Sequence, residues 1–117
     1  MRIKKSIQEN VSKVINDCKA VFVKEIINLC KQIGGEPGQD ILFAKPIMLV
    51  IADNKSSKEM NFNIKPIIAD RLGYVELDKR SYFLLYFDDK VVASSHYLGL
   101  SDLDVVFAAM RRVVREY

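Results

Sequence analysis

The chain has 117 residues, of which half are hydrophobic and 28% are charged. These proportions are typical of a folded globular protein and exclude an intrinsically disordered chain. The length predicts one domain over residues 1–117, which buries roughly two-thirds of its unfolded surface without disulfides or metals. The formal charge of +3 comes from residues 1–31, whose seven basic and three acidic side chains give +4. The remainder carries eleven basic and twelve acidic side chains, a net of −1.

The chain start and the apolar runs bear on location. Polar residues follow the basic start MRIKKSIQEN, where a signal peptide would have an apolar segment. The longest apolar runs, 46–52 and 82–87, are too short to cross a bilayer. We therefore expect a cytoplasmic protein that does not enter membranes.

The two cysteines indicate free thiols. Cys18 and Cys30 fall twelve residues apart in one predicted helix, a separation of about 18 Å that is beyond disulfide reach. The chain has one histidine and no Cys/His spacing of a zinc site. We expect no bound metal and no cofactor.

The first predicted element is a long helix over residues 3–33. Apolar residues recur there at steps of three and four, which places them on one helical face: Ile3, Ile7, Val11, Val14, Cys18, Phe22, Ile26, Leu29 and Ile33. From Ala20 onward further apolar residues lie off that face: Val21, Val23, Ile27 and Cys30. A helix that is apolar on several sides must be covered on several sides. Either the domain wraps it or a second subunit covers it.

The glycine-rich stretch KQIGGEPGQD, residues 31–40, follows this helix. A phosphate-binding loop needs a strand before the glycines and a helix after them, because the helix N-terminus attracts the anion. Here the order is reversed, so the stretch is interpreted as a helix end. Gly34 or Gly35 is expected to adopt the left-handed cap, and Pro37 blocks continuation.

Strands and a short helix are predicted next. Residues 41–44 and 47–52 are strand-like and are separated by Lys45-Pro46, and residues 53–62 form a polar connection. The apolar residues of 64–72 follow helical spacing, with Asn63 as a cap, Pro66 in the first turn and Gly73 at the end. A short helix is therefore expected over 64–72, with a strand as the alternative.

The last third predicts a meander and a helix. Residues 74–77, 82–87 and 91–95 are short strand-like runs separated by turns. The final helix begins near Ser101 and carries one apolar stripe: Leu103, Val106, Phe107, Met110, Val113, Val114 and Tyr117.

Together these elements predict an α+β fold. It has a long N-terminal helix, a mainly antiparallel sheet ending in a three-strand meander, a short middle helix and a C-terminal amphipathic helix packed on the sheet. By element order alone this is similar to the profilin-like folds, which include roadblock and longin domains. No residue motif accompanies that likeness, so it carries no functional residues.

Two groups of residues invite a catalytic interpretation. Ser94, Ser95 and His96 resemble parts of a hydrolase, but neighbouring residues of a strand point to opposite faces, and no oxyanion loop is evident. Asp53, Glu76 and Asp78 offer oxygens for Mg²⁺ as in a nuclease, yet strand-end and turn positions also explain them. We expect no enzymatic activity, with a metal-dependent nuclease as the catalytic alternative.

Two binding functions remain. The leading hypothesis is a non-enzymatic protein–protein interaction module, a homodimer or other homo-oligomer, because the first helix carries more apolar surface than one face of cover explains. Its candidate contacts are Phe22, Val23, Ile26, Ile27 and Cys30. The competing interpretation is that these residues form the monomer core. The alternative function is nucleic-acid binding by basic residues of the first and last helices: Lys13, Lys24, Lys31, Arg111, Arg112 and Arg115.

Overall fold

The computed structural model describes residues 2–53 and 63–117. Its elements, in chain order, are α1 (Arg2–Gln32), β1 (Asp40–Asp53), β2 (Asn63–Glu76), β3 (Ser81–Phe87), β4 (Lys90–Ser94) and α2 (Leu100–Glu116). The strands form one antiparallel sheet in the order β1-β2-β3-β4. The predicted α+β class, the long first helix and the final helix are confirmed.

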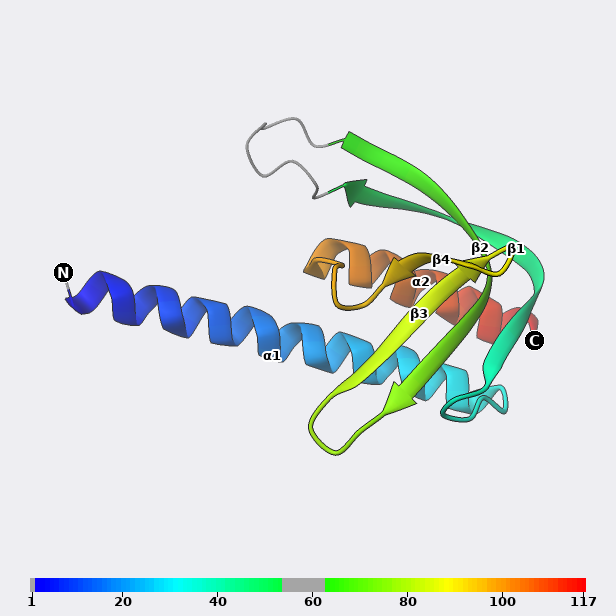
Figure 1. Ribbon diagram of the computed structural model, residues 1–117, viewed down its shortest axis with the longest axis horizontal. Helices are drawn as coiled ribbons and strands as arrows, with labels where there is room; N and C mark the ends of the chain where they lie inside the picture. Colours follow the sequence, from blue (N-terminus) through cyan, green and yellow to red (C-terminus); the bar gives the residue numbers. More distant parts are fainter. Residues whose placement is uncertain (1, 54–62) are drawn as a thin grey trace.

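Both helices lie on the same side of the sheet (Figure 1). α1 packs against α2 and β3, and α2 also packs against β1. The 31 residues of α1 make it about 46 Å long, close to the 53 Å long dimension of the molecule. Its second half lies alongside α2 and the sheet, whereas its first half projects beyond them (Figure 1).

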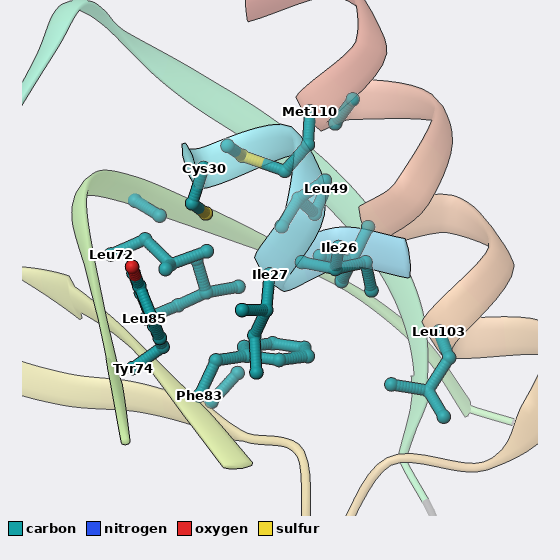
Figure 2. Packing of buried hydrophobic residues seen from close by; sticks show 14 of the residues in the cluster. Ile26, Ile27, Cys30, Leu49, Leu72, Tyr74, Phe83, Leu85, Leu103 and Met110 are labelled. Atoms are coloured by element: carbon teal, nitrogen blue, oxygen red, sulfur yellow. The ribbon is translucent and has the colours of Figure 1, made fainter. Parts of the chain in front are cut away.

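The core lies between the two helices and the sheet (Figure 2). Ile26 and Cys30 of α1 are fully buried, and Phe83 of β3 and Met110 of α2 are fully buried with them. α1 supplies Val23 and Ile27 to the same cluster. One layer of side chains therefore joins both helices to all the central strands.

The predicted short middle helix is wrong, because residues 63–76 form the long strand β2. The sheet is consequently a four-strand meander, and the predicted three-strand meander is wrong as well. The likeness to profilin-like folds depended on a helix between the strands, so it no longer holds.

The wrong helix has an identifiable cause. Ala69 and Leu72 are both buried on the helix-covered side, although they lie three residues apart. Strict alternation would place such residues on opposite faces. The shift falls at Asp70, where β1 carries a bulge: Leu42 pairs with Arg71 and Ile47 pairs with Ala69, leaving four residues of β1 between them. Across the bulge, the side of β2 that faces the helices changes from odd-numbered Ala69 to even-numbered Leu72. The buried residues of β2 are therefore three apart there, which is the spacing of a helix.

Both prolines of the β1–β2 ribbon occupy positions that need no ladder donor. Pro46 lies inside the bulge. The backbone N–H of Ala52 points away from β2, since it donates to Asp102 Oδ1 of α2 at 2.8 Å. Successive N–H groups of a strand point alternately toward and away from its neighbour, so Val50, two residues before Ala52, also points its N–H away from β2. Pro66 pairs with Val50, so the position of its missing N–H faces away from β1 and needs no partner there.

The stretch after α1 ends the helix as expected. Gly34 adopts a φ of +86°, the left-handed conformation that favours glycine, and Gly35 N–H donates to Cys30 O at 2.9 Å. Tyr74 holds the loop to the sheet, because its hydroxyl donates to Gly35 O at 2.9 Å. The loop is thus a packed helix end.

Replacing Ile26 by Ala tests whether the second half of α1 is core. Because Ile26 is fully buried, Ile26→Ala should lower the free energy of unfolding by about 2–5 kcal/mol in urea denaturation. Leu77→Ala, at an exposed position, should change it by less than about 0.5 kcal/mol. A similar small effect for both variants would contradict the packing described.

Candidate functional site

Four of the five predicted partner contacts lie inside the protein's own core. Val23, Ile26, Ile27 and Cys30 are all buried against the sheet or α2. This arrangement matches the competing interpretation that they form the monomer core. Their contact with a partner stays a prediction. Phe22, the fifth residue, is half-buried and lies at the border of the core.

Phe22 marks the place where α1 meets α2. Its ring packs edge-on against that of Phe107, with 6.3 Å between the ring centroids. The guanidinium of Arg111 lies over the Phe107 ring, 5.7 Å from the ring centroid. α2 therefore covers α1 from Phe22 onward, and this aromatic pair closes the covered region.

Before Phe22, α1 presents an apolar stripe to solvent. The side chains of Val11, Val14, Ile15 and Val21 are between 42% and 59% exposed, and Cys18 is exposed among them. We call these five residues the α1 stripe. Val11, Val14, Cys18 and Val21 follow steps of three, four and three, as in the seam of a coiled coil. Val21, expected off the apolar face, therefore lies at its edge beside Val14.

A shallow groove continues the α1 stripe toward α2. It encloses about 450 Å³ and is lined by Val14, Asp17, Cys18, Val21, Phe22, Glu25 and Phe107. The walls come from α1 and from one aromatic ring of α2. Its elongated, apolar surface suits the side of another helix, which packs into such grooves by ridges of side chains.

Sequence reasoning chose candidate contacts that lie mostly in the buried half of α1. The periodicity of 3–33 detected the apolar face but did not distinguish its covered part from its exposed part. A usable signal was present: the steps of three and four run through Val11 and Val14, well before the all-round apolar segment begins. Phe107, which ends the groove, could be assigned only from the packing of α2.

The open face of the sheet is a second apolar surface. Met48 and Ile68 are paired neighbours on β1 and β2, and both are exposed, as is Val50. Arg71 lies farther along this sheet and is held by Asp40 at 3.2 Å and Asp89 at 3.0 Å. Among residues 2–53 and 63–117, no helix or strand packs on this face.

The predicted basic residues do not form one patch. Lys24 follows Phe22 by two residues, about 200° around the helix, so it points away from α2. Lys13 and Lys31 share that side of α1 by spacing, and Lys31 pairs with Glu76 at 2.5 Å. Arg111, Arg112 and Arg115 lie on α2. The two clusters thus face different directions, and nucleic-acid binding across both stays a prediction.

The serines and histidine near the end of β4 have structural partners. Ser95 is buried, and its Oγ accepts the backbone N–H of Phe83 at 3.1 Å. Ser94 Oγ accepts the backbone N–H of His96 at 3.3 Å, and the His96 ring lies against Tyr82. Neither hydroxyl therefore has the imidazole partner that would activate it as a nucleophile in this geometry.

The three carboxylates proposed for a metal are spread along the sheet. Asp53 pairs with Asn63 at the start of β2, whereas Glu76 ends the same strand and contacts Lys31. Asp78 lies in the following loop. Within residues 2–53 and 63–117, no three His, Cys, Asp or Glu side chains come together in a way that would hold a metal.

The two cysteines differ in their environments. Burial raises the pKa of Cys30 to about 12 from 9.0, although a backbone hydrogen bond partly opposes the shift. The pKa of Cys30 is higher in the folded chain than in the unfolded chain, so burial of the protonated thiol contributes fully to the stability of the fold below pH 9. That contribution is lost as the pH rises toward 12 and the thiol ionises. The pKa of the Tyr74 hydroxyl is raised as well. Burial is the largest cause, and the charges of neighbouring Glu76, Cys30 and Glu36 raise it further.

Neither the character of the helices nor comparison with known proteins assigns a function. In the part of the chain that the structure describes, neither helix combines the length and apolar character needed to span a membrane. Comparisons with models of protein families, with curated proteins and with solved structures gave no match.

A thiol titration should distinguish Cys18 from Cys30. At pH 8 and low protein concentration, a chromogenic disulfide reagent should react promptly with one thiol per folded chain, because Cys18 is exposed and Cys30 is buried and protonated. Adding denaturant should release the second equivalent. Prompt reaction of two thiols in the folded protein would contradict the buried position of Cys30.

Proposed function

We propose that the protein is a non-enzymatic interaction module that self-associates through the first half of α1. The observation that carries this proposal is the α1 stripe, an apolar seam on a helix that projects beyond its own domain. Exposed apolar residues scattered singly are ordinary, whereas a contiguous apolar surface favours a protein contact.

The shape of α1 supports a helical partner. In water, a projecting helix gains little from propensity alone, and most helical stability in proteins comes from packing of an apolar face. Fully burying one Val or Ile side chain contributes about 1.5–3 kcal/mol, and the stripe offers four such side chains, each roughly half exposed. A second copy of the same helix would cover this surface and supply an equal apolar surface of its own.

The buried residues of α1 have a supporting part in this proposal. Val23, Ile26, Ile27 and Cys30 fix the second half of the helix to the domain. They thereby hold the first half in an extended position where a partner can reach it. Phe22 joins the two regions, because it contacts Phe107 on one side and lines the groove on the other.

Val14→Glu tests the proposed contact. Light scattering of the unmodified protein should give a mass near twice 13.4 kDa at high concentration, and Val14→Glu should return it to the mass of one chain. A charge placed in an apolar seam must be desolvated without a partner, which disfavours association. Circular dichroism should show that the variant stays folded, since Val14 is 59% exposed.

Val91→Glu is the matched control, because Val91 is 55% exposed and lies on β4, away from the stripe. It should leave the dimer mass unchanged. A single-chain mass for the unmodified protein at every concentration would contradict self-association. A mass increase that appears only on adding DNA or RNA, and that weakens with salt, would instead support nucleic-acid binding.

A further inference from the structure

The charged residues beside the α1 stripe constrain how two copies could pair. Asp17 and Lys24 each follow a stripe valine, Val14 and Val21, by three residues. Three residues turn a helix by about 300°, which is about 60° less than a full turn, so both charges lie beside the seam on the same side. They are exposed, have opposite signs and lie one heptad apart.

Resting on the proposed self-association, we infer that two α1 helices pair antiparallel, with Asp17 of each copy opposite Lys24 of the other. Twofold symmetry requires a self-complementary surface, in which residue i meets residue j and j meets i. An acid and a base one heptad apart on the same flank meet this requirement when the second helix is reversed. Cys18 then faces Val21 in the seam, so the centre of the pairing falls between residues 19 and 20. Asp17 and Lys24 lie on the flank about two residues, or 3 Å, from direct opposition, a gap that the lysine side chain spans.

The same register places apolar groups together along the seam. Cys18 of each copy lies opposite Val21 of the other, next to the centre. On the flank nearer α2, Ile15 lies near Phe22 of the second copy, about two residues from direct opposition. Glu25 falls at the outer end of the paired segment, opposite Val14, where its carboxylate can extend into water. Each projecting half then runs along the groove that Phe107 closes.

A parallel pairing uses the same stripe less well. It would place Glu25 directly opposite Glu25 of the second copy, and like charges at that distance repel. The flank position facing Asp17 would be occupied by Phe22, so the acid would have no basic partner. The charge pattern of the described helix therefore favours the reversed orientation.

Charge exchange tests the orientation. Asp17→Lys or Lys24→Asp should each raise the dimer dissociation constant roughly tenfold at moderate salt, because each change replaces two attractive contacts by two repulsive ones. The double variant Asp17→Lys/Lys24→Asp should restore the dissociation constant of the unmodified protein to within about twofold. Sedimentation equilibrium measures all three.

Matched controls carry the same charge changes outside α1. Asp78→Lys and Lys79→Asp lie in the exposed loop between β2 and β3, and neither should change the dissociation constant. If the single α1 variants weaken the dimer and the double variant fails to recover it, the opposition of Asp17 and Lys24 is overturned.

Disulfide trapping provides a second readout. In the antiparallel register, the two Cys18 residues are offset by three residues, about 4.5 Å along helices 8–10 Å apart, so they exceed disulfide reach. Oxidation should leave the unmodified protein uncrosslinked, whereas Val21→Cys should yield a crosslinked dimer through Cys18 and the new cysteine. Crosslinking of the unmodified protein through Cys18 would overturn the orientation but keep the dimer. A monomer at all concentrations would overturn the proposed function itself.

Discussion

The packing of the second half of α1 against α2 and the sheet is the interaction on which the rest of the structure depends. Ile26 and Cys30 have no exposed surface, and they contact a core that also contains Phe83 and Met110. Removing this half would expose the inner face of the central strands. Because a helix is stiff, fixing one half also sets the direction of the other, and the first half of α1 must then project from the domain (Figure 1).

Two buried polar side chains contribute to this architecture, and one of them, Ser95, resembled part of a catalytic site. Ser95 joins the end of β4 to β3 through Phe83, and Asp102 joins the first turn of α2 to β1 through Ala52. Both side chains are buried and hydrogen-bonded, as buried polar groups must be to offset their desolvation. These hydrogen bonds join β4 to β3 and α2 to β1 in the layers that enclose the second half of α1.

Much of the architecture could be predicted from the sequence where one periodicity ran without interruption. The steps of three and four in α1 and the stripe of α2 gave both helices nearly to their ends. The failure came at residues 64–72, because the bulge in β1 shifts the alternation of β2 and gives Ala69 and Leu72 a spacing of three. A bulge depends on pairing between distant segments, so local spacing could not reveal it.

The candidate site, like the fold, could be predicted from the sequence only in part. Apolar surplus on α1 was visible in the sequence, but which part of it the domain covers depends on where α2 contacts α1, at Phe22 and Phe107. That contact joins residues far apart in the chain, so composition and periodicity could not locate it. The predicted contacts therefore include mostly buried residues, and the exposed valines are not among them.

Amide hydrogen exchange of α1 as a function of protein concentration tests the central claim most directly. The claim is that one helix serves the core with its second half and a second copy with its first. Amides of residues 23–30 should be protected equally at low and high concentration, because they belong to the folded domain. Amides of residues 11–21 should exchange quickly in dilute solution and become protected as the concentration rises. Protection of 11–21 that does not depend on concentration, or loss of protection in 23–30 on dilution, would contradict the account.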